Sequence, residues 1–167
     1  MEIRLDGKVA LITGGSMGMG KAMAQKFAAS GAAVAIVARR PEPLADAARE
    51  IVAAGGRCRP YAGDVSKAGE VSRLFSAIID DLGRVDILVN NAGRSQAGKF
   101  EDLTDEIWRG DFDLKVFAAV RFARLALPGM KSRRWGRNRP AHAGCRVLAI
   151  GSRSHRQDHN RGHAGPK

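Results

Sequence analysis

The stretch that decides the fold is Thr13-Gly14-Gly15-Ser16-Met17-Gly18-Met19-Gly20. It follows an apolar run at residues 8–13 and opens a helical pattern at residues 18–29. Glycines in a strand-to-helix turn let the backbone approach a pyrophosphate closely, and the helix N-terminus offers unpaired N–H groups and a partial positive charge. At the first strand–helix junction of a parallel sheet, this spacing indicates a phosphate-binding turn rather than a tight turn without a ligand.

Outward from this turn, the first 130 residues alternate short apolar runs with longer helical patterns. This alternation is typical of βαβ units, which build a parallel sheet covered on both faces. Strands are expected at residues 8–13, 33–38, 57–62 and 86–90, and helices at residues 18–29, 43–54, 66–82 (capped by Ser66) and 104–127 (capped by Thr104 and stopped by Pro128-Gly129). Right-handed crossovers then predict a doubly wound α/β fold with strand order 3-2-1-4.

Two further stretches follow the ends of predicted strands. Asp64-Val65 comes after the third strand, and Asn90-Asn91-Ala92-Gly93 comes after the fourth. In open α/β sheets, ligands bind in the crevice outside the carboxyl ends of the strands. Both stretches are therefore candidates for the same site as the glycine-rich turn.

Arg39 and Arg40 follow the second strand, 19 residues beyond Gly20. An acidic residue in this region would hydrogen-bond the adenosine ribose 2′-hydroxyl of NAD, whereas an arginine would receive the 2′-phosphate of NADP. The two arginines therefore favour NADP over NAD. The alternative is that both are solvated side chains in front of Pro41.

The glycine-rich turn, Asp64-Val65 and Asn90 to Gly93, in this order and spacing, resemble the short-chain dehydrogenase/reductase family over residues 5 to about 137. The resemblance implies a Rossmann-type fold and hydride transfer between a nicotinamide dinucleotide and a small carbonyl or alcohol substrate. The residues expected to bind NADP or NAD are Gly14, Ser16, Met17, Gly18, Met19, Gly20, Arg39, Asp64, Val65, Asn91, Ala92 and Gly93.

Each part of this set has its own implied contact. The turn residues would line the pyrophosphate and ribose. Asp64 and Val65 would flank the adenine, with the Asp64 carboxylate facing its amino group. Asn91 to Gly93 would border the adenosine ribose and the nicotinamide side, and they can form a structural turn between strands at the same time.

The catalytic residues that the resemblance implies are missing from their expected places. The family uses a tyrosine as acid/base, a lysine that lowers its pKa, a serine that orients substrate and an asparagine in a proton relay. At the relay position this chain has Asp113, and an aspartate donates no hydrogen bond unless it is protonated. Tyr61 is the one tyrosine of the chain, is expected to pack on the third strand, and belongs to no Tyr-x-x-x-Lys motif. Catalytic residues are therefore left unassigned.

The resemblance stops after Arg137, where a buried strand beginning Ile-Val is expected and the chain reads Asn138-Arg139-Pro140. Residues 137–167 hold seven Lys/Arg, one acid and all four histidines, and they carry +6 of the net charge of +11. We interpret residues 1–137 as an NAD(P)-binding domain with an incomplete sheet of about four to five strands, and residues 138–167 as a basic, disordered tail. A one-nucleotide frameshift would explain the change, because an extra A before ATC GTC turns Ile-Val into Asn-Arg.

Three hypotheses follow for this chain. The first is a truncated oxidoreductase domain that retains cofactor binding. The second is a non-enzymatic basic protein that binds nucleic acid or another polyanion through the tail, although no aromatic residue for base stacking follows Trp135. The third is a fragment that cannot fold, because the fourth strand would be an uncovered hydrophobic edge. His163-x-x-x-Lys167 repeats the spacing of a tyrosine–lysine pair, but the neighbouring glycines and proline disfavour a helix there.

Composition adds expectations about location and partners. The longest apolar stretch, residues 32–38, is far too short to span a bilayer, which favours a soluble, cytoplasmic protein without a membrane partner. Cys58 and Cys145 are far apart and imply neither a disulfide nor a metal site. The resemblance also implies a homo-oligomer that pairs through the helix at residues 104–127.

Overall fold

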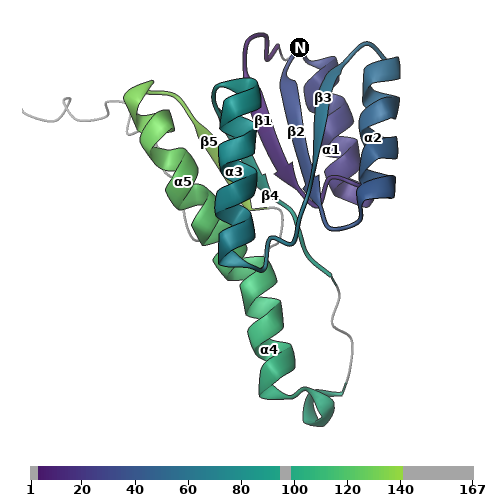
Figure 1. Cartoon of the computed structure of the whole chain (residues 1–167), viewed down its shortest axis with the longest axis vertical. Coiled ribbons are helices and arrows are strands. Elements are labelled where there is room, and N and C mark those ends of the chain that lie inside the picture. The colour runs from purple at the N-terminus through teal and green to yellow at the C-terminus, as the bar shows by residue number, and fades with distance from the viewer. Residues whose placement is uncertain (1–3, 95–98, 141–167) are drawn as a thin grey trace, which may run out of the picture.

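The computed structural model describes residues 4–94 and 99–140, which form one parallel sheet with helices on both faces (Figure 1). The strands are β1 (Val9–Thr13), β2 (Ala33–Ala38), β3 (Arg57–Ala62), β4 (Ile87–Asn90) and β5 (Arg137–Pro140). The helices are α1 (Gly18–Ala29), α2 (Pro41–Ala53), α3 (Ala68–Leu82), α4 (Asp105–Phe112) and α5 (Ala118–Ser132), with a 3-10 turn η1 (Phe100–Asp102) and a π-helical turn η2 (Asp113–Phe117). The strand order β3-β2-β1-β4-β5 confirms the doubly wound fold and extends the expected order by one strand.

The central strand β1 is buried along its whole length because helices cover both faces of the sheet. Leu11 packs into the layer that contains α3 and α5, whereas Ala10 and Ile12 pack into the layer that contains α1 and α2. Phe122 of α5 and Leu44 of α2 are fully buried in these two layers. A strand buried on both faces reads as a continuous apolar run, as residues 9–12 do.

Strand β5 corrects the expectation that β4 would be an uncovered edge. It pairs in parallel with β4, with Arg137 opposite Ile87 and Arg139 opposite Val89. Residues 138–140 therefore belong to the sheet rather than to the tail, and residues 141–167 lie outside the described part of the chain. Among the described strands β5 is the outermost next to β4, and it carries two arginines and a proline, residue types that disfavour pairing at a sheet edge.

Two expected helix signals are wrong. Ser66 does not cap α3, whose cap residue is Lys67; its hydroxyl instead donates to Asp64 Oδ1 at 2.8 Å. Pro128 does not end the long helix but lies inside α5, which continues to Ser132. Ala126 and Met130 are buried on either side of this proline, so tertiary packing holds the helix together beyond it.

The remaining composition-based expectations concern a cysteine and the membrane. Cys58 lies partly buried on β3 against the layer of α1 and α2, as expected for a small apolar strand residue. Burial raises the pKa of its thiol to about 12. Within residues 4–94 and 99–140, no helix has the length and apolar character needed to span a bilayer.

A buried carboxylate, Asp86, joins three elements at the amino end of the sheet. Its Oδ2 accepts a hydrogen bond from the backbone N–H of Val9 at 3.0 Å, at the start of β1. Its Oδ1 accepts from Arg84 Nε and Nη2 at 3.0 and 2.8 Å, and lies 3.4 Å from Arg133 Nε just after α5. Arg133 also donates to the Val85 carbonyl at 2.9 Å. Asp86 is fully buried, so the hydrogen bonds from Val9 and Arg84, together with the nearby charge of Arg133, replace the water that its charge has lost.

We expect Asp86→Ala to lower the free energy of unfolding by about 3 kcal/mol. The substitution leaves the buried N–H of Val9 without its acceptor and the guanidinium groups of Arg84 and Arg133 without their carboxylate. Urea unfolding followed by circular dichroism measures the change. Asp80→Ala, at an exposed position of α3, is the control and should shift stability by no more than about 0.5 kcal/mol. Equal stability of the two variants would contradict this role for Asp86.

Candidate nucleotide-binding site

The glycine-rich turn is bound to the end of β2 through its backbone. The N–H groups of Gly14 and Gly15 both donate to the Val37 carbonyl, at 2.7 and 3.2 Å. Gly14 and Gly18 have φ values of +69° and +55°, in the left-handed region that favours glycine. Both bends of the turn therefore depend on residues without a side chain.

Helix α1 begins against the turn with almost no space between them. A Cβ on Gly20 would collide with the carbonyl oxygen of Gly14. The first turn of α1 contains no acidic residue, so nothing on the helix neutralises the partial positive charge at its N-terminus. A helix N-terminus of this kind can offer backbone N–H groups to an anion, and the anion site itself stays a prediction.

A small hydrogen-bond network ties the glycine-rich turn to the end of β4. Thr13 Oγ1 accepts from the backbone N–H groups of Asn91 and Ala92 at 3.0 and 2.9 Å. Asn91 Nδ2 in return donates to the carbonyls of Thr13 and Gly14 at 3.1 and 3.2 Å. Asn91 thus has the structural role that the sequence allowed for it, and it holds the two halves of the site together.

These elements surround a cleft of about 540 Å³ at the carboxyl ends of β1, β2 and β4. The residues that line it are Gly14, Ser16, Met17, Met19, Val37, Ala38, Arg39, Arg40, Gly63, Val65, Asn91, Ala92, Gly93 and Leu114. The cleft therefore brings together the glycine-rich turn, the arginines after β2, and the segments after β3 and β4. This is the crevice where ligands bind in doubly wound sheets.

Three of the expected site residues do not line the cleft. Gly18 forms the second left-handed bend, and Gly20 permits the close approach of α1 to the turn. Asp64 organises the loop after β3, since its Oδ1 accepts from the backbone N–H of Ser66 at 3.0 Å and from its hydroxyl at 2.8 Å. Burial alone would raise the pKa of Asp64, but the hydrogen bonds from Ser66 and the nearby charge of Arg39 lower it below its usual value.

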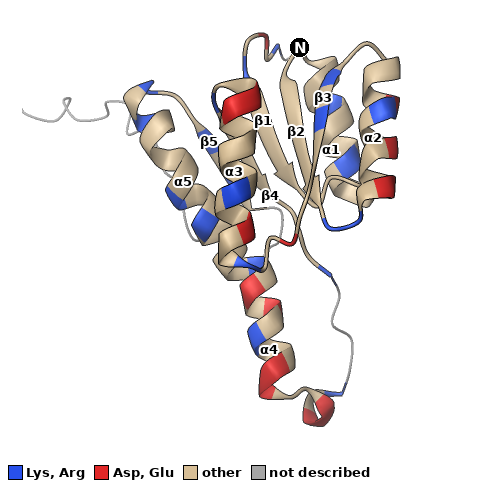
Figure 2. Ribbon diagram, in the orientation of Figure 1, with Lys and Arg blue, Asp and Glu red and all other residues tan. Residues whose placement is uncertain are grey.

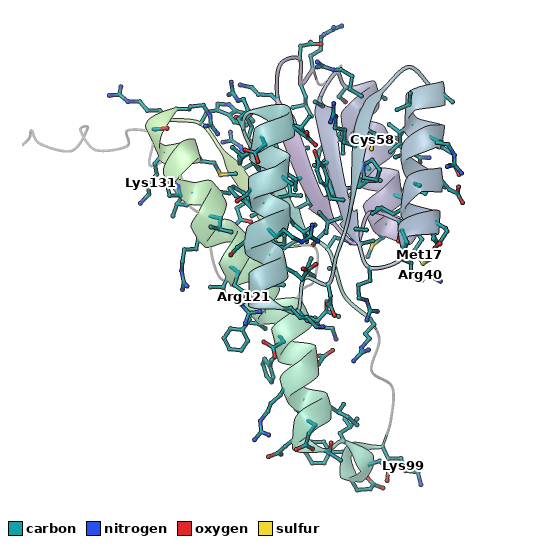
Figure 3. All side chains as sticks on the ribbon, viewed as in Figure 1. Met17, Arg40, Cys58, Lys99, Arg121 and Lys131 are labelled. Atoms are coloured by element: carbon teal, nitrogen blue, oxygen red, sulfur yellow. The ribbon has the colours of Figure 1, made fainter. Side chains whose placement is uncertain are left out.

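Sequence reasoning missed four lining residues, Val37, Ala38, Gly63 and Leu114, whereas it had named Arg40 together with Arg39. Val37 and Ala38 end β2, and Gly63 follows β3, so their strand-end positions were the available signal. Arg40 lies beside Met17, with Nη2 3.8 Å from its Sδ (Figure 3). Leu114 comes from η2, and nothing in its local pattern indicates that it reaches the cleft.

The two side chains considered for catalysis are engaged elsewhere. Tyr61 donates its hydroxyl proton to Asp81 at 2.8 Å, and burial together with this bond raises the pKa of the phenol. It also packs against the layer of α3 and α5, as expected. Asp113 forms an ion pair with Arg121, with Oδ1 3.2 Å from Nη2. His163 and Lys167 lie outside the described residues.

The geometry of the sheet and its cleft defines a Rossmann-type α/β protein with a glycine-rich turn. The family model described as short chain dehydrogenase matches residues 8–137. D-beta-hydroxybutyrate dehydrogenase of Cupriavidus necator is 38% identical over 136 residues, which cover 80% of this chain and 52% of that protein. A short chain dehydrogenase of Pseudocercospora fijiensis is 39% identical over 135 residues, covering 80% and 44%.

The solved structures agree with the sequence comparisons. L-sorbose reductase from Gluconobacter frateurii, solved with NADPH and L-sorbose, is 40% identical with a TM-score of 0.76, over 80% of this chain and 51% of that one. This chain belongs to the short-chain dehydrogenase family. It spans about half the length of the relatives that it matches.

We expect Gly20→Ala to lower the free energy of unfolding by about 2 kcal/mol, because the new methyl group forces α1 away from the Gly14 carbonyl. Thermal and urea unfolding measure the loss. Gly69→Ala is the matched control, since a Cβ there meets nothing within 4 Å and the residue lies in the first turn of α3. That variant should keep its stability or gain up to about 1 kcal/mol. A neutral Gly20→Ala would show that the turn and helix are not tightly packed.

Proposed function

We propose that this chain binds NADP in the cleft at the carboxyl ends of β1, β2 and β4. The observation that carries the proposal is the meeting of the α1 N-terminus, a glycine-rich turn and two arginines at one cleft. Solved relatives were crystallised with either form of the cofactor: L-sorbose reductase with NADPH, and 7 alpha-hydroxysteroid dehydrogenase with NADH. The parent protein would use the cofactor for hydride transfer to or from a carbonyl or alcohol.

The residues present fit such a dinucleotide. The turn packs closely on its neighbours, since Cβ atoms at Gly14 or Gly20 would meet backbone or side-chain atoms, and this packing holds its backbone at the edge of the cleft, where we place the pyrophosphate. In our proposal, Ser16, Met17 and Met19 line the pyrophosphate and ribose, with Gly18 at the bend. The adenine lies beside Val65, with Asp64 behind it, and Asn91, Ala92 and Gly93 border the ribose and nicotinamide. When bound, the nicotinamide supplies the hydride.

The proposed preference for NADP over NAD depends on the two arginines after β2. Arg39 and Arg40 both line the cleft and are exposed, so either guanidinium can face a 2′-phosphate. The charge of Arg39 also lowers the pKa of the Asp64 carboxyl group, in addition to the hydrogen bonds from Ser66, so Arg39 and the loop after β3 are near neighbours. We propose that Arg39 is the main partner of the 2′-phosphate.

We expect Arg39→Ala to weaken NADP binding by about 1 to 3 kcal/mol, because a charge-assisted hydrogen bond to phosphate is lost. NAD binding should hardly change. Isothermal titration with both cofactors measures the preference, and Arg49→Ala, on the exposed part of α2, is the control for loss of one positive charge. Equal affinity of the unmodified chain for NADP and NAD would overturn the assignment, and a larger effect of Arg40→Ala would transfer it to Arg40.

We further propose that this chain retains cofactor binding without turnover. A carbonyl reduction needs a proton delivered as the hydride arrives, and a positioned acid/base commonly contributes a factor of about 10² to 10⁴. In the described residues, Tyr61 is bonded to Asp81 beyond the cleft lining, and Asp113 is paired with Arg121. Neither is placed to deliver that proton.

We therefore expect no change in cofactor absorbance when the chain is mixed with saturating NADPH or NADP and a panel of small ketones and secondary alcohols. The same assay on His163→Ala tests the tail. Turnover in the unmodified chain that disappears in His163→Ala would show that the tail carries the acid/base, and it would overturn this proposal.

A second copy of the chain is the proposed partner of the long helical segment. Figure 1 shows α4 extending away from the sheet, and none of its residues is buried. Trp108, Phe112 and Phe117 are 41 to 50% exposed along one continuous segment. Acidic side chains gather on α4 and basic ones on α5 (Figure 2), so an antiparallel pair of these segments would bring opposite charges together while covering the aromatic rings.

A further inference from the structure

The loop after β3 carries one wall of the cleft, and backbone hydrogen bonds tie it to the end of β2 and close its turn: Gly63 N–H donates to the Ala38 carbonyl at 3.0 Å and Lys67 N–H to the Asp64 carbonyl at 3.1 Å. Val65 lines the cleft, is 4% exposed and packs in the layer of α3 and α5, so its position depends on that packing and on the backbone on either side of it. On its N-terminal side, Asp64 bonds to Ser66 and closes a tight turn around Val65. The carbonyl of Ser66 accepts a hydrogen bond from Arg121 Nη1 at 2.9 Å. A side chain from a distant helix therefore restrains this loop.

The second terminal nitrogen of the Arg121 guanidinium connects to another wall of the cleft. Its Nη2 donates to Asp113 Oδ1 at 3.2 Å, and Asp113 directly precedes Leu114, which lines the cleft. The guanidinium group also lies over the ring of Phe117, 5.6 Å from its centroid. Figure 3 shows Arg121 near the base of α3, where α5 approaches the loop after β3. The planar guanidinium group of Arg121 thus connects the segments that carry Val65 and Leu114.

The turn η2 continues directly into α5, and its Leu114 packs against the core, whereas the helix before it adds no buried residue. No residue of α4 or η2 is fully buried. Residues of α5 are buried in the layer with α3, so α5 is the firm element from which a side chain can hold η2. Arginine suits this task because its rigid fork donates two hydrogen bonds in fixed directions.

We propose that Arg121 is a positioning residue. It holds the two cleft-lining side chains Val65 and Leu114 at the separation needed to bind the adenine of the cofactor between them. The proposal rests on the proposed function, since it requires a dinucleotide in the cleft with its base beside Val65. Arg121 itself does not line the cleft. It acts through the Ser66 carbonyl on one side and the Asp113 carboxylate on the other.

The test uses the full chain and two adenine-bearing probes. Isothermal titration with 2′,5′-ADP measures affinity for the adenine half, and the fluorescence anisotropy of 1,N6-etheno-NADP at saturation measures how rigidly the base is held. We expect Arg121→Ala to lower the affinity for 2′,5′-ADP about tenfold, as for the loss of a charge-assisted hydrogen bond, and to lower the anisotropy of the bound probe. Asp113→Ala removes one of the two arms and should lower affinity about threefold, less than Arg121→Ala.

Arg124→Ala is the matched control, because Arg124 lies on the same helix and is exposed. It should keep the affinity and the anisotropy of the unmodified chain. If Arg121→Ala behaves like Arg124→Ala, the positioning role is wrong. If Arg121→Ala does not fold, Asp113→Ala decides, and an unchanged anisotropy in that variant overturns the proposal. Failure of the unmodified chain to bind either probe would instead refute the proposed function.

Discussion

The close contact between the start of α1 and the ends of β1 and β4 is the constraint on which the rest of the site depends. Gly20 lies against the carbonyl of Gly14, and Asn91 donates to the carbonyls of Thr13 and Gly14. Any side chain at Gly20 would separate the helix from the turn. The same contact places the helix N-terminus at the cleft and sets the direction in which the chain leaves β4. Packing and binding geometry are therefore one property of this corner of the molecule.

The two ends of the sheet differ in how their polar groups are used. At the amino end, the buried Asp86 joins β1, β4 and the end of α5 through N–H and guanidinium donors. At the carboxyl end, the glycine-rich turn and the exposed Arg39 and Arg40 surround the cleft. A parallel sheet allows this separation because all strand ends of one kind lie at the same edge. The hydrogen bonds and ion pairs of Asp86 stabilise the amino end of the sheet, whereas the carboxyl end carries the cleft in which we propose that the ligand binds.

Much of the fold could be predicted from local pattern. The apolar runs of β1, β2 and β4, the helical spacing between them and the glycine-rich turn led to the correct strand order, because right-handed crossovers leave few alternatives. Errors arose where local signals competed with packing. Pro128 predicted a helix end, but Met130 is buried beyond it; Ser66 predicted a cap, but its hydroxyl bonds to Asp64. Strand β5 was missed because its Arg-Asn-Arg-Pro sequence lacks an apolar pattern, and its extended form shows in the pairing with β4.

The sequence by itself determined the family, the sheet and most residues of the cleft, because glycine at a left-handed bend and polar residues at strand ends are local requirements. It also showed that the one tyrosine stands outside the family's catalytic motif. Only the tertiary structure decided which residues face the cleft and which support it: Gly20 and Asp64 support it, whereas Arg40 and Leu114 face it. It alone brought Arg121 to both Ser66 and Asp113, 55 and 8 positions away in the chain. The physical reason is that the packing of α5 on the sheet decides which acceptors the Arg121 guanidinium reaches, and the spacing of residues in the sequence does not indicate that packing.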